Sequence, residues 1–286
     1  MRPDDWHLTH DLDAFLDRAG DFLASRPALH SVPLTVTDAL RRRGPHVFGE
    51  EDPVFGTLET GGEVGAVFLR TPPYWINLTP LTEEQADALA ARLASAGHRL
   101  PGVFAESGTA TAFAEAWQRH TGVEASRQRS QRLYRLGKLT PPEPVPDGAA
   151  RIATAADRTQ LARWYDEFCE SIGEPGLQDS GAWADSRISH GGAAFWETPD
   201  GTPVSLASAA PEVAGQVRVS TVYTPSQLRG RGYAGAVTTE VSRAARAAGA
   251  AEVLLFTDLA NPTSNGLYQR IGYRPVADFA VYGFEE

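Results

Sequence analysis

The spacing of apolar residues predicts two similar series of helices and strands. In the first series, apolar positions recur with a helical period near the start of the chain and again before residue 43. Short strand-like runs then alternate with Thr-Gly-Gly and Thr-Pro-Pro, which favour turns. The predicted elements are helices over 12–23, 34–43, 82–95 and 110–120, and strands over 53–59, 63–70, 74–79, near 103 and over 129–136.

The second series repeats this order of elements. Its predicted helices cover 155–168, 234–248 and 263–271, and its strands cover 193–198, 204–210, 216–223, 252–257 and 276–284. Each series runs helix, antiparallel meander, helix, strand, helix, strand. We therefore expect an α+β fold with two domains, each a mixed, mostly antiparallel sheet flanked by helices.

A proline-rich stretch separates the two series. Residues 140–148, Thr-Pro-Pro-Glu-Pro-Val-Pro-Asp-Gly, contain four prolines, which remove backbone donors and favour an extended segment. A chain of 286 residues also has the length of two ordinary domains. The sequence predicts one domain over 1–140, a linker over 141–148 and a second domain over 149–286.

A glycine-rich loop carries the most specific chemistry. Gln227-Leu-Arg-Gly-Arg-Gly-Tyr-Ala-Gly235 lies between a predicted strand and a predicted helix, where glycines allow tight turns and exposed amides attract phosphate. Between residues 218 and 246 there are five arginines and one acid, although the whole chain has a net charge of −10. This local charge favours an anionic ligand. The overall acidity disfavours nucleic acid as a partner.

Two other interpretations of this loop are weaker. Gly230, Gly232 and Gly235 also fit G-x-G-x-x-G, and Asp258 follows at the spacing of a dinucleotide-binding fold. However, six residues separate the preceding strand from Gly230, an antiparallel meander precedes it, and only 28 residues remain after Asp258. A glycine-rich turn that only caps a helix is the other interpretation.

Three motifs in order resemble the GNAT acyltransferase superfamily. Gln227-Leu-Arg-Gly-Arg-Gly232 resembles its Q/R-x-x-G-x-G/A signature, Asn261–Tyr268 resembles its N-x-x-S-x-x-x-Y segment, and Ile271-Gly-Tyr273 resembles the G-F/Y that follows. The resemblance covers residues 216–284. It implies two GNAT-like domains and an N-acyltransferase that moves an acetyl group from the co-substrate acetyl-CoA to an amine by direct attack.

The resemblance also implies a set of residues that bind acetyl-CoA. Backbone amides of the glycine loop would hold the pyrophosphate, the end of the strand before the loop would pair with the pantetheine arm, and Asn261 would bind that arm by its side chain. The implied binding residues are Val222, Thr224, Gln227, Arg229, Gly230, Arg231, Gly232, Tyr233, Ala234, Asn261 and Ser264.

Tyr268 is the expected catalytic acid, because a phenol beside the sulfur can protonate the departing thiolate. The alternative for Tyr268 is core packing. The general base is less defined, since the strand over 216–223 has no carboxylate. The candidates are Glu197, Glu174, Asp179 and Asp185, and Glu197 is the residue we select. The acids of the loop over 170–190, with nearby Glu167, suit a cationic amine.

Other kinds of site find little support in the sequence. His190 is the only histidine after the linker, there is no G-x-S-x-G, and Cys169 is expected to pack rather than react. We therefore expect no metal. The acidic start of the chain lacks a signal peptide, no apolar run could span a membrane, and we expect a cytoplasmic protein. Its arginine-rich composition is typical of a GC-rich bacterium.

The first domain is expected to lack a CoA loop. The equivalent stretch after residue 78 reads Thr-Pro-Leu-Thr, without glycine or arginine, and proline has no amide to donate. This domain would be a degenerate copy, as in tandem relatives such as mycothiol synthase. Two hypotheses follow for the chain, which we expect to be a monomer or homodimer: an acetyl-CoA-dependent N-acetyltransferase, or a catalytically silent acyl-CoA-binding or regulatory protein.

Overall fold

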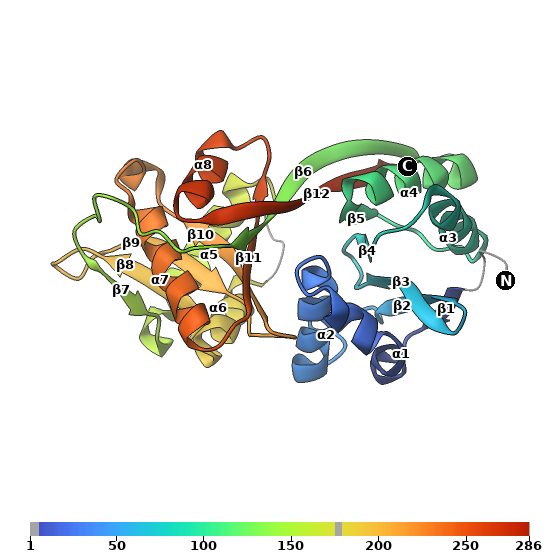
Figure 1. Cartoon of the computed structure of the whole chain (residues 1–286), viewed down its shortest axis with the longest axis horizontal. Helices are drawn as coiled ribbons and strands as arrows, with labels where there is room; N and C mark the ends of the chain where they lie inside the picture. Colours follow the sequence, from blue (N-terminus) through green and yellow to red (C-terminus); the bar gives the residue numbers. More distant parts are fainter. Residues whose placement is uncertain (1–5, 175–178, 286) are drawn as a thin grey trace. The chain divides into compact units, whose positions relative to one another are not determined.

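The computed structural model describes residues 6–174 and 179–285, which form two compact units (Figure 1). Unit 1 contains the chain up to residue 133 together with 258–260 and the carboxyl-terminal segment from 276. Unit 2 contains residues 134–257 and 261–275. Two long strands, β6 (Glu124–Leu136) and β12 (Tyr273–Glu285), each run from one unit into the other.

This division corrects the predicted boundaries in two places. The proline-rich segment 141–148 lies within unit 2 instead of between the units. The last strand, expected in the second domain, pairs with β5 of unit 1, where Phe279–Gly283 is antiparallel to Gly102–Glu106. Apolar periodicity marks a strand but says nothing about its partner, so the sequence could not show this exchange.

Unit 1 is a mostly antiparallel sheet with helices on both faces. Its strands follow the order β1-β2-β3-β4-β5-β12, and only β4 and β5 run parallel. Its other elements are β1 (Trp6–Thr9), α1 (Leu12–Ser25), α2 (Ser31–Arg43), β2 (Val54–Thr60), β3 (Glu63–Arg70), β4 (Ile76–Leu78), α3 (Glu83–Ser95), β5 (Gly102–Glu106) and α4 (Ser107–Thr121).

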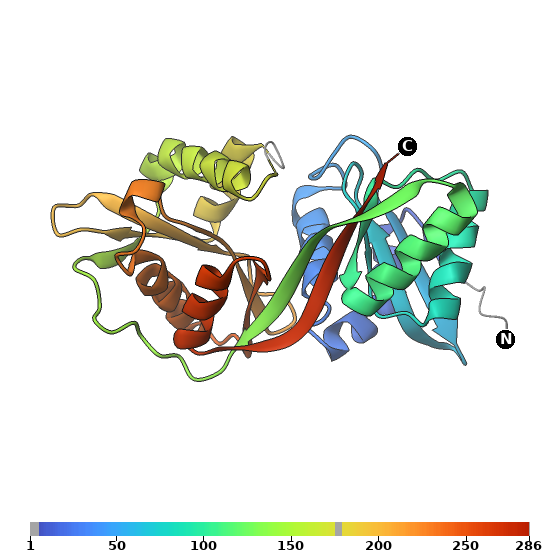
Figure 2. The same ribbon diagram turned by 90° about the horizontal axis from the view of Figure 1, so that it is seen from above.

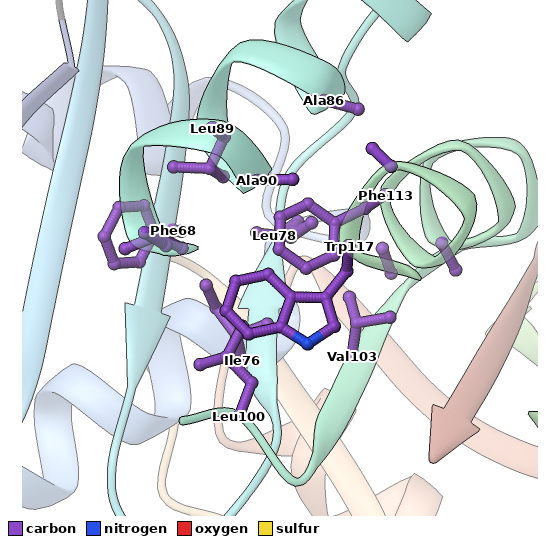
Figure 3. Close-up of a cluster of buried hydrophobic side chains, with 14 of the residues drawn as sticks. Phe68, Ile76, Leu78, Ala86, Leu89, Ala90, Leu100, Val103, Phe113 and Trp117 are labelled. Carbon is purple, nitrogen blue, oxygen red and sulfur yellow. The ribbon is translucent and has the colours of Figure 1, made fainter. Parts of the chain in front are cut away.

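The main core of unit 1 lies between its sheet and the α3–α4 pair (Figure 3). Phe68, Ile76 and Leu78 project from the strands toward Leu89 of α3 and Phe113 of α4, and all five are buried. On the other face, Phe15 of α1 stacks on Phe55 of β2. The alternation of strand residues between the two faces explains why the sheet needs helices on both sides.

Unit 2 has the same architecture. Its strands follow the order β6-β11-β10-β9-β8-β7, and α5 and α6 lie on the opposite face from α7 and α8 (Figure 2). The elements are β7 (Ala149–Ile152), α5 (Arg158–Ser171), α6 (Ser180–Ser189), β8 (Ala193–Glu197), β9 (Pro203–Ala209), β10 (Gln216–Tyr223), α7 (Tyr233–Ala247), β11 (Glu252–Asp258) and α8 (Pro262–Arg270), with 3₁₀ turns at Ala155–Asp157 and Ser226–Leu228.

The predicted α+β class and the order of the main elements are confirmed. Three elements were not predicted: the short edge strands β1 and β7, and α6, which lies where a loop was expected. Edge strands of four residues carry too little periodicity to detect. No described helix is long and apolar enough to cross a membrane.

Candidate functional site

The strands β10 and β11 pair in parallel over only part of their length. Residues 216–219 are in register with 252–255, and the pairing of β10 with β9 shifts between Val219 and Val222. Beyond Val219 the ladder between β10 and β11 ends, although both strands continue. Separating strands can present backbone groups to an extended ligand. The predicted residues Val222 and Thr224 lie at this end of β10.

The glycine loop follows directly and bends twice in the left-handed region. Gly230 has φ 78° and Gly232 has φ 84°, values that favour glycine. Arg229 donates from Nε to the carbonyl of Thr224 at 3.1 Å, which ties the loop to the end of β10. Arg229 and Arg231 are both exposed, so two positive charges flank the bend.

The helix α7 begins at the end of this loop without a side-chain cap. Gly232 is its N-cap residue, and the first turn starts at Tyr233 and Ala234. An uncapped first turn leaves backbone N–H groups for a ligand, and the helix dipole adds partial positive charge there. Gln227 lies in the 3₁₀ turn just before the loop and is exposed. This arrangement suits a phosphate group.

The helix α8 packs against the first turn of α7. Leu267 Cδ1 lies 3.3 Å from the position that a Cβ atom would take at Gly235, so a larger residue there would crowd the Leu267 side chain. Asn261 caps α8 by accepting from the Ser264 amide at 3.0 Å. The cap uses the Asn261 Oδ1 atom and not the Nδ2 group, which is a hydrogen-bond donor. The motif residues of both helices therefore lie together.

Tyr268 is buried in α8. Its ring packs edge-on against Tyr273, with 6.1 Å between ring centroids, and its hydroxyl makes no hydrogen bond to any residue that the structure describes. Tyr273 differs, because its hydroxyl lies 2.8 Å from Ser242 Oγ. Burial, and secondarily Tyr273, raises the pKa of Tyr268 well above its ordinary value. The phenol therefore stays protonated at neutral pH.

Glu197, selected as the general base, lies in an ion-pair network. Its carboxylate accepts from Arg151 Nη2 at 2.7 Å, and Arg151 also binds Asp157. The network stabilises the charges of its members: hydrogen bonds from Arg151 lower the pKa of Asp157 to about 2. The ion pair with Arg151 occupies the carboxylate oxygen that would have to accept a proton from the amine, so this contact argues against Glu197 as the base.

Two of the other predicted acids, Asp179 and Asp185, already have partners within the chain. Asp185 pairs with Arg158 Nε at 2.7 Å, and Asp179 caps α6 through the amide of Ala182. Part of the expected acceptor loop, residues 175–178, lies outside the described residues.

A contact that the sequence did not suggest joins Glu167 to Tyr223. The Tyr223 hydroxyl donates to Glu167 Oε2 at 2.7 Å, which links α5 to the end of β10. Burial, and then this contact, raises the pKa of Tyr223 to about 12. The Glu167 side chain is 37% exposed, and its Oε1 atom lies 3.8 Å from Arg163 Nε, a longer contact than the 2.7 Å between Glu197 and Arg151. One signal was available: Glu167 lies three positions after Trp164, on the helix face that packs on the sheet.

No group of three or more histidine, cysteine or acidic side chains within the described residues could hold a metal ion. Cys169 is buried, and burial raises the pKa of its thiol. A thiol in such surroundings is a poor nucleophile.

Comparisons with known proteins identify the fold. Residues 212–280, which include the glycine loop and α8, match the model of the FR47-like protein family. No curated protein matches the sequence. Many solved structures match it, and several cover nearly the whole chain.

Three of these structures illustrate the similarity. A GCN5-related N-acetyltransferase from Sphaerobacter thermophilus is 18% identical, with a TM-score of 0.62, and covers 99% of this chain and 96% of its own. A GNAT-family acetyltransferase from Colwellia psychrerythraea is 13% identical, with a TM-score of 0.60, and the match covers 98% of this chain and 99% of that protein. A tandem GNAT protein from the clavulanic acid biosynthesis pathway is 12% identical, with a TM-score of 0.55, and the match covers 99% of this chain and 98% of that protein. The chain thus has the tandem GNAT fold along its whole length, and unit 2 contains most of the segment that matches the FR47-like family.

Proposed function

We propose that unit 2 is an N-acyltransferase that takes an acetyl group from acetyl-CoA and passes it to an amine. The observation that carries this proposal is the uncapped N-terminus of α7, reached through a glycine loop with two exposed arginines. The CoA pyrophosphate is the anion that this geometry suits, bound by the amides from Arg229 to Ala234. The similar structures include a GCN5-related N-acetyltransferase and a GNAT-family acetyltransferase, which supports the same activity.

The rest of the donor would follow the separating strands. The pantetheine arm carries amide groups that can pair with backbone groups near Val222 and Thr224, as an added strand would. Asn261 Nδ2 is available on the other side of the arm, because only its Oδ1 atom caps α8. This placement directs the thioester toward α8, where Tyr268 lies. No metal takes part in this scheme.

Tyr268 would act as the general acid. The amine attacks the thioester carbonyl carbon, a C–N bond forms, and the C–S bond then breaks with its electron pair on sulfur. Protonation of that thiolate by the Tyr268 phenol completes the departure of CoA. The buried, protonated hydroxyl, which has no partner among the described residues, is suited to this transfer.

The attacking amine must also lose a proton, and we propose Glu167 as the base that receives it through water. Its carboxylate is held at the end of β10 by Tyr223 and remains partly exposed. Both acids contact an arginine, but Arg163 lies 3.8 Å from Glu167, whereas Arg151 lies 2.7 Å from the less exposed Glu197. The comparison of Glu167→Gln with Glu197→Gln separates the two: we expect the first to lower kcat by about 100-fold and the second to leave kcat nearly unchanged. The reverse order would restore Glu197 as the base.

Calorimetry with acetyl-CoA tests the proposal directly. Gly230→Asp combined with Gly232→Asp places two negative charges at the phosphate site, and we expect it to abolish binding. Gly201→Asp is the matched control, because Gly201 also has a left-handed φ of 83° and open space around it. Absence of acetyl-CoA binding by the wild type at millimolar concentration, or binding that survives the double substitution, would refute the proposal.

A second measurement separates the enzyme from a silent CoA-binding protein. Acetyl-CoA is incubated with a panel of amines, and the release of free CoA thiol is followed. We expect thiol release with at least one amine and none without an amine. Tight acetyl-CoA binding with no thiol release from any amine in the panel would favour the silent protein.

A further inference from the structure

The segment between β6 and β7 is held against unit 2 at both of its ends. At its start, the Gly137 amide donates to the carbonyl of Gly272 and the Thr140 amide to that of Ile271, each at 3.0 Å. At its end, Trp196 Nε1 donates to the carbonyl of Asp147 at 3.1 Å. A segment fixed in this way is part of the folded unit rather than a free linker.

The middle of this segment crosses the first turn of α7 (Figure 1). Pro146 ring atoms lie 3.7 Å from the position that a Cβ atom would take at Gly232, the N-cap of α7. Pro142 lies 3.9 Å from the equivalent position at Gly235. The prolines therefore form an apolar surface directly beside the loop that presents Arg229 and Arg231.

Val145 is the large exposed apolar residue of this segment. Its exposed fraction is 56%, higher than that of Ile152 or Val276, the other large hydrophobic residues found exposed in the described chain. It lies next to Pro146 and follows three other prolines in the segment. Prolines restrict the backbone, so a ligand that packs here would order little extra chain.

We infer that Val145 and its flanking prolines bind the adenosine half of CoA. In acetyl-CoA a ribose joins the phosphates to a flat purine whose faces can pack on apolar side chains, and this end of α7 offers arginines and amides beside the prolines. The inference rests on the proposed function, because the phosphates place the adenosine. The segment then contributes to the affinity for CoA over thioesters that lack the nucleotide, such as acetyl-4′-phosphopantetheine.

The experiment compares two exposed β-branched residues of unit 2 in the full-length protein. Binding of acetyl-CoA and of acetyl-4′-phosphopantetheine is measured by calorimetry for the wild type, Val145→Ser and Ile152→Ser. We expect Val145→Ser to weaken acetyl-CoA binding about fivefold, through lost apolar contact, and to leave acetyl-4′-phosphopantetheine binding unchanged. Ile152→Ser, on the edge strand β7, should change neither ligand's affinity. Both residues are exposed, so neither change should impair folding.

The outcomes separate this inference from the proposed function. If the wild type binds no acetyl-CoA, the proposed function fails and the inference with it. If acetyl-CoA binds equally well to all three proteins, the inference alone is wrong. An equal loss for both thioesters upon Val145→Ser would also overturn it, because the nucleotide would not be the group that Val145 contacts.

Discussion

The two units each have a helix at the same point of the fold, but the N-terminus of that helix is capped in one unit and not in the other. In unit 1, α3 follows β4 and leads to the parallel strand β5; in unit 2, α7 follows β10 and leads to β11. The first turn of α3 is closed by a capping box, in which Thr82 Oγ1 accepts from the Gln85 amide and Gln85 Oε1 accepts from the Thr82 amide. The first turn of α7 has no side-chain cap.

The loops before these helices differ in the same sense. In unit 1 the amide of Leu81 donates to Thr109 Oγ1 of α4 at 3.0 Å, and the neighbouring Pro80 has no amide hydrogen. In unit 2 the loop contains Gly230 and Gly232, and exposed arginines stand beside them. Donors at the start of α3 are used internally in unit 1, whereas the first turn of α7 in unit 2 has no side-chain acceptor.

The helices that follow the second parallel strand extend the comparison. In α4, Phe113 and Trp117 fill the core and stack with 6.0 Å between ring centroids, and the helix has no tyrosine (Figure 3). In α8, Tyr268 brings a hydroxyl into the buried position. The shared topology thus supports a structural unit and a candidate catalytic unit, and a few polar groups at helix ends distinguish them.

The largest expected effect tests the candidate catalytic unit at Tyr268. Tyr268→Phe keeps the ring and should lower kcat by about 100-fold or more, because the thiolate loses its acid. Acetyl-CoA affinity should change little. Tyr273→Phe is the matched control, since Tyr273 is a buried tyrosine of the same unit whose hydroxyl is used by Ser242. Equal kcat values for the two variants would assign Tyr268 to packing alone.

Two carboxyl groups, one in each unit, should contribute to stability with opposite dependence on pH. Arg151 holds the pKa of Asp157 in unit 2 at about 2, below its ordinary 3.8, so its stabilisation is full above pH 3.8 and is lost as the pH falls toward 2. Burial raises the pKa of Glu106 in unit 1, so its contribution is full below its ordinary 4.5 and is lost as the pH rises.

We therefore expect opposite changes in the free energy of unfolding at pH 7. Asp157→Asn should lower it by about 2 kcal/mol, because the shifted pKa is worth roughly that much. Glu106→Gln should raise it, because the buried charge is removed. Urea titrations at pH 7 and pH 3 measure the free energy of unfolding of the wild type and of both variants. At pH 3 each variant should differ less from the wild type than at pH 7. A destabilising Glu106→Gln at pH 7 would show that its carboxylate is paired.

The smallest expected effect concerns the cap of α3. Thr82→Ala should lower the free energy of unfolding by about 1 kcal/mol, the usual contribution of an N-cap hydroxyl. The substitution removes the side-chain cap from the N-terminus of α3 but adds no glycine or arginine to the preceding loop. Calorimetry should therefore still find one bound acetyl-CoA per chain. A second binding site in this variant would mean that the cap alone distinguishes the two units.

The sequence was most informative where function depends on a short, contiguous segment. The glycine loop, Asn261 and Tyr268 could be located because each motif lies within a few residues, and the structure brings α7 and α8 together through Gly235 and Leu267. The capping box of Thr82 is equally local, because its two partners lie three residues apart. Such features depend on neighbours in the chain, which the sequence shows directly.

The partners of the candidate bases could not be found in this way. Glu197 fitted a position on a strand, but its partner Arg151 comes from the neighbouring strand β7, which was not predicted. Glu167 was one acid among several until the fold placed it beside Tyr223, 56 residues away. The protonation and charge of a carboxylate depend on such partners.

The sequence by itself determined the fold class, the order of the main elements and the motif residues of unit 2, because these follow from periodicity and local spacing. Only the tertiary structure decided that β12 completes the sheet of unit 1, that the proline-rich segment crosses the first turn of α7, and which acids are already paired. These depend on contacts between residues distant in the chain, and a side-chain pattern does not specify its partner.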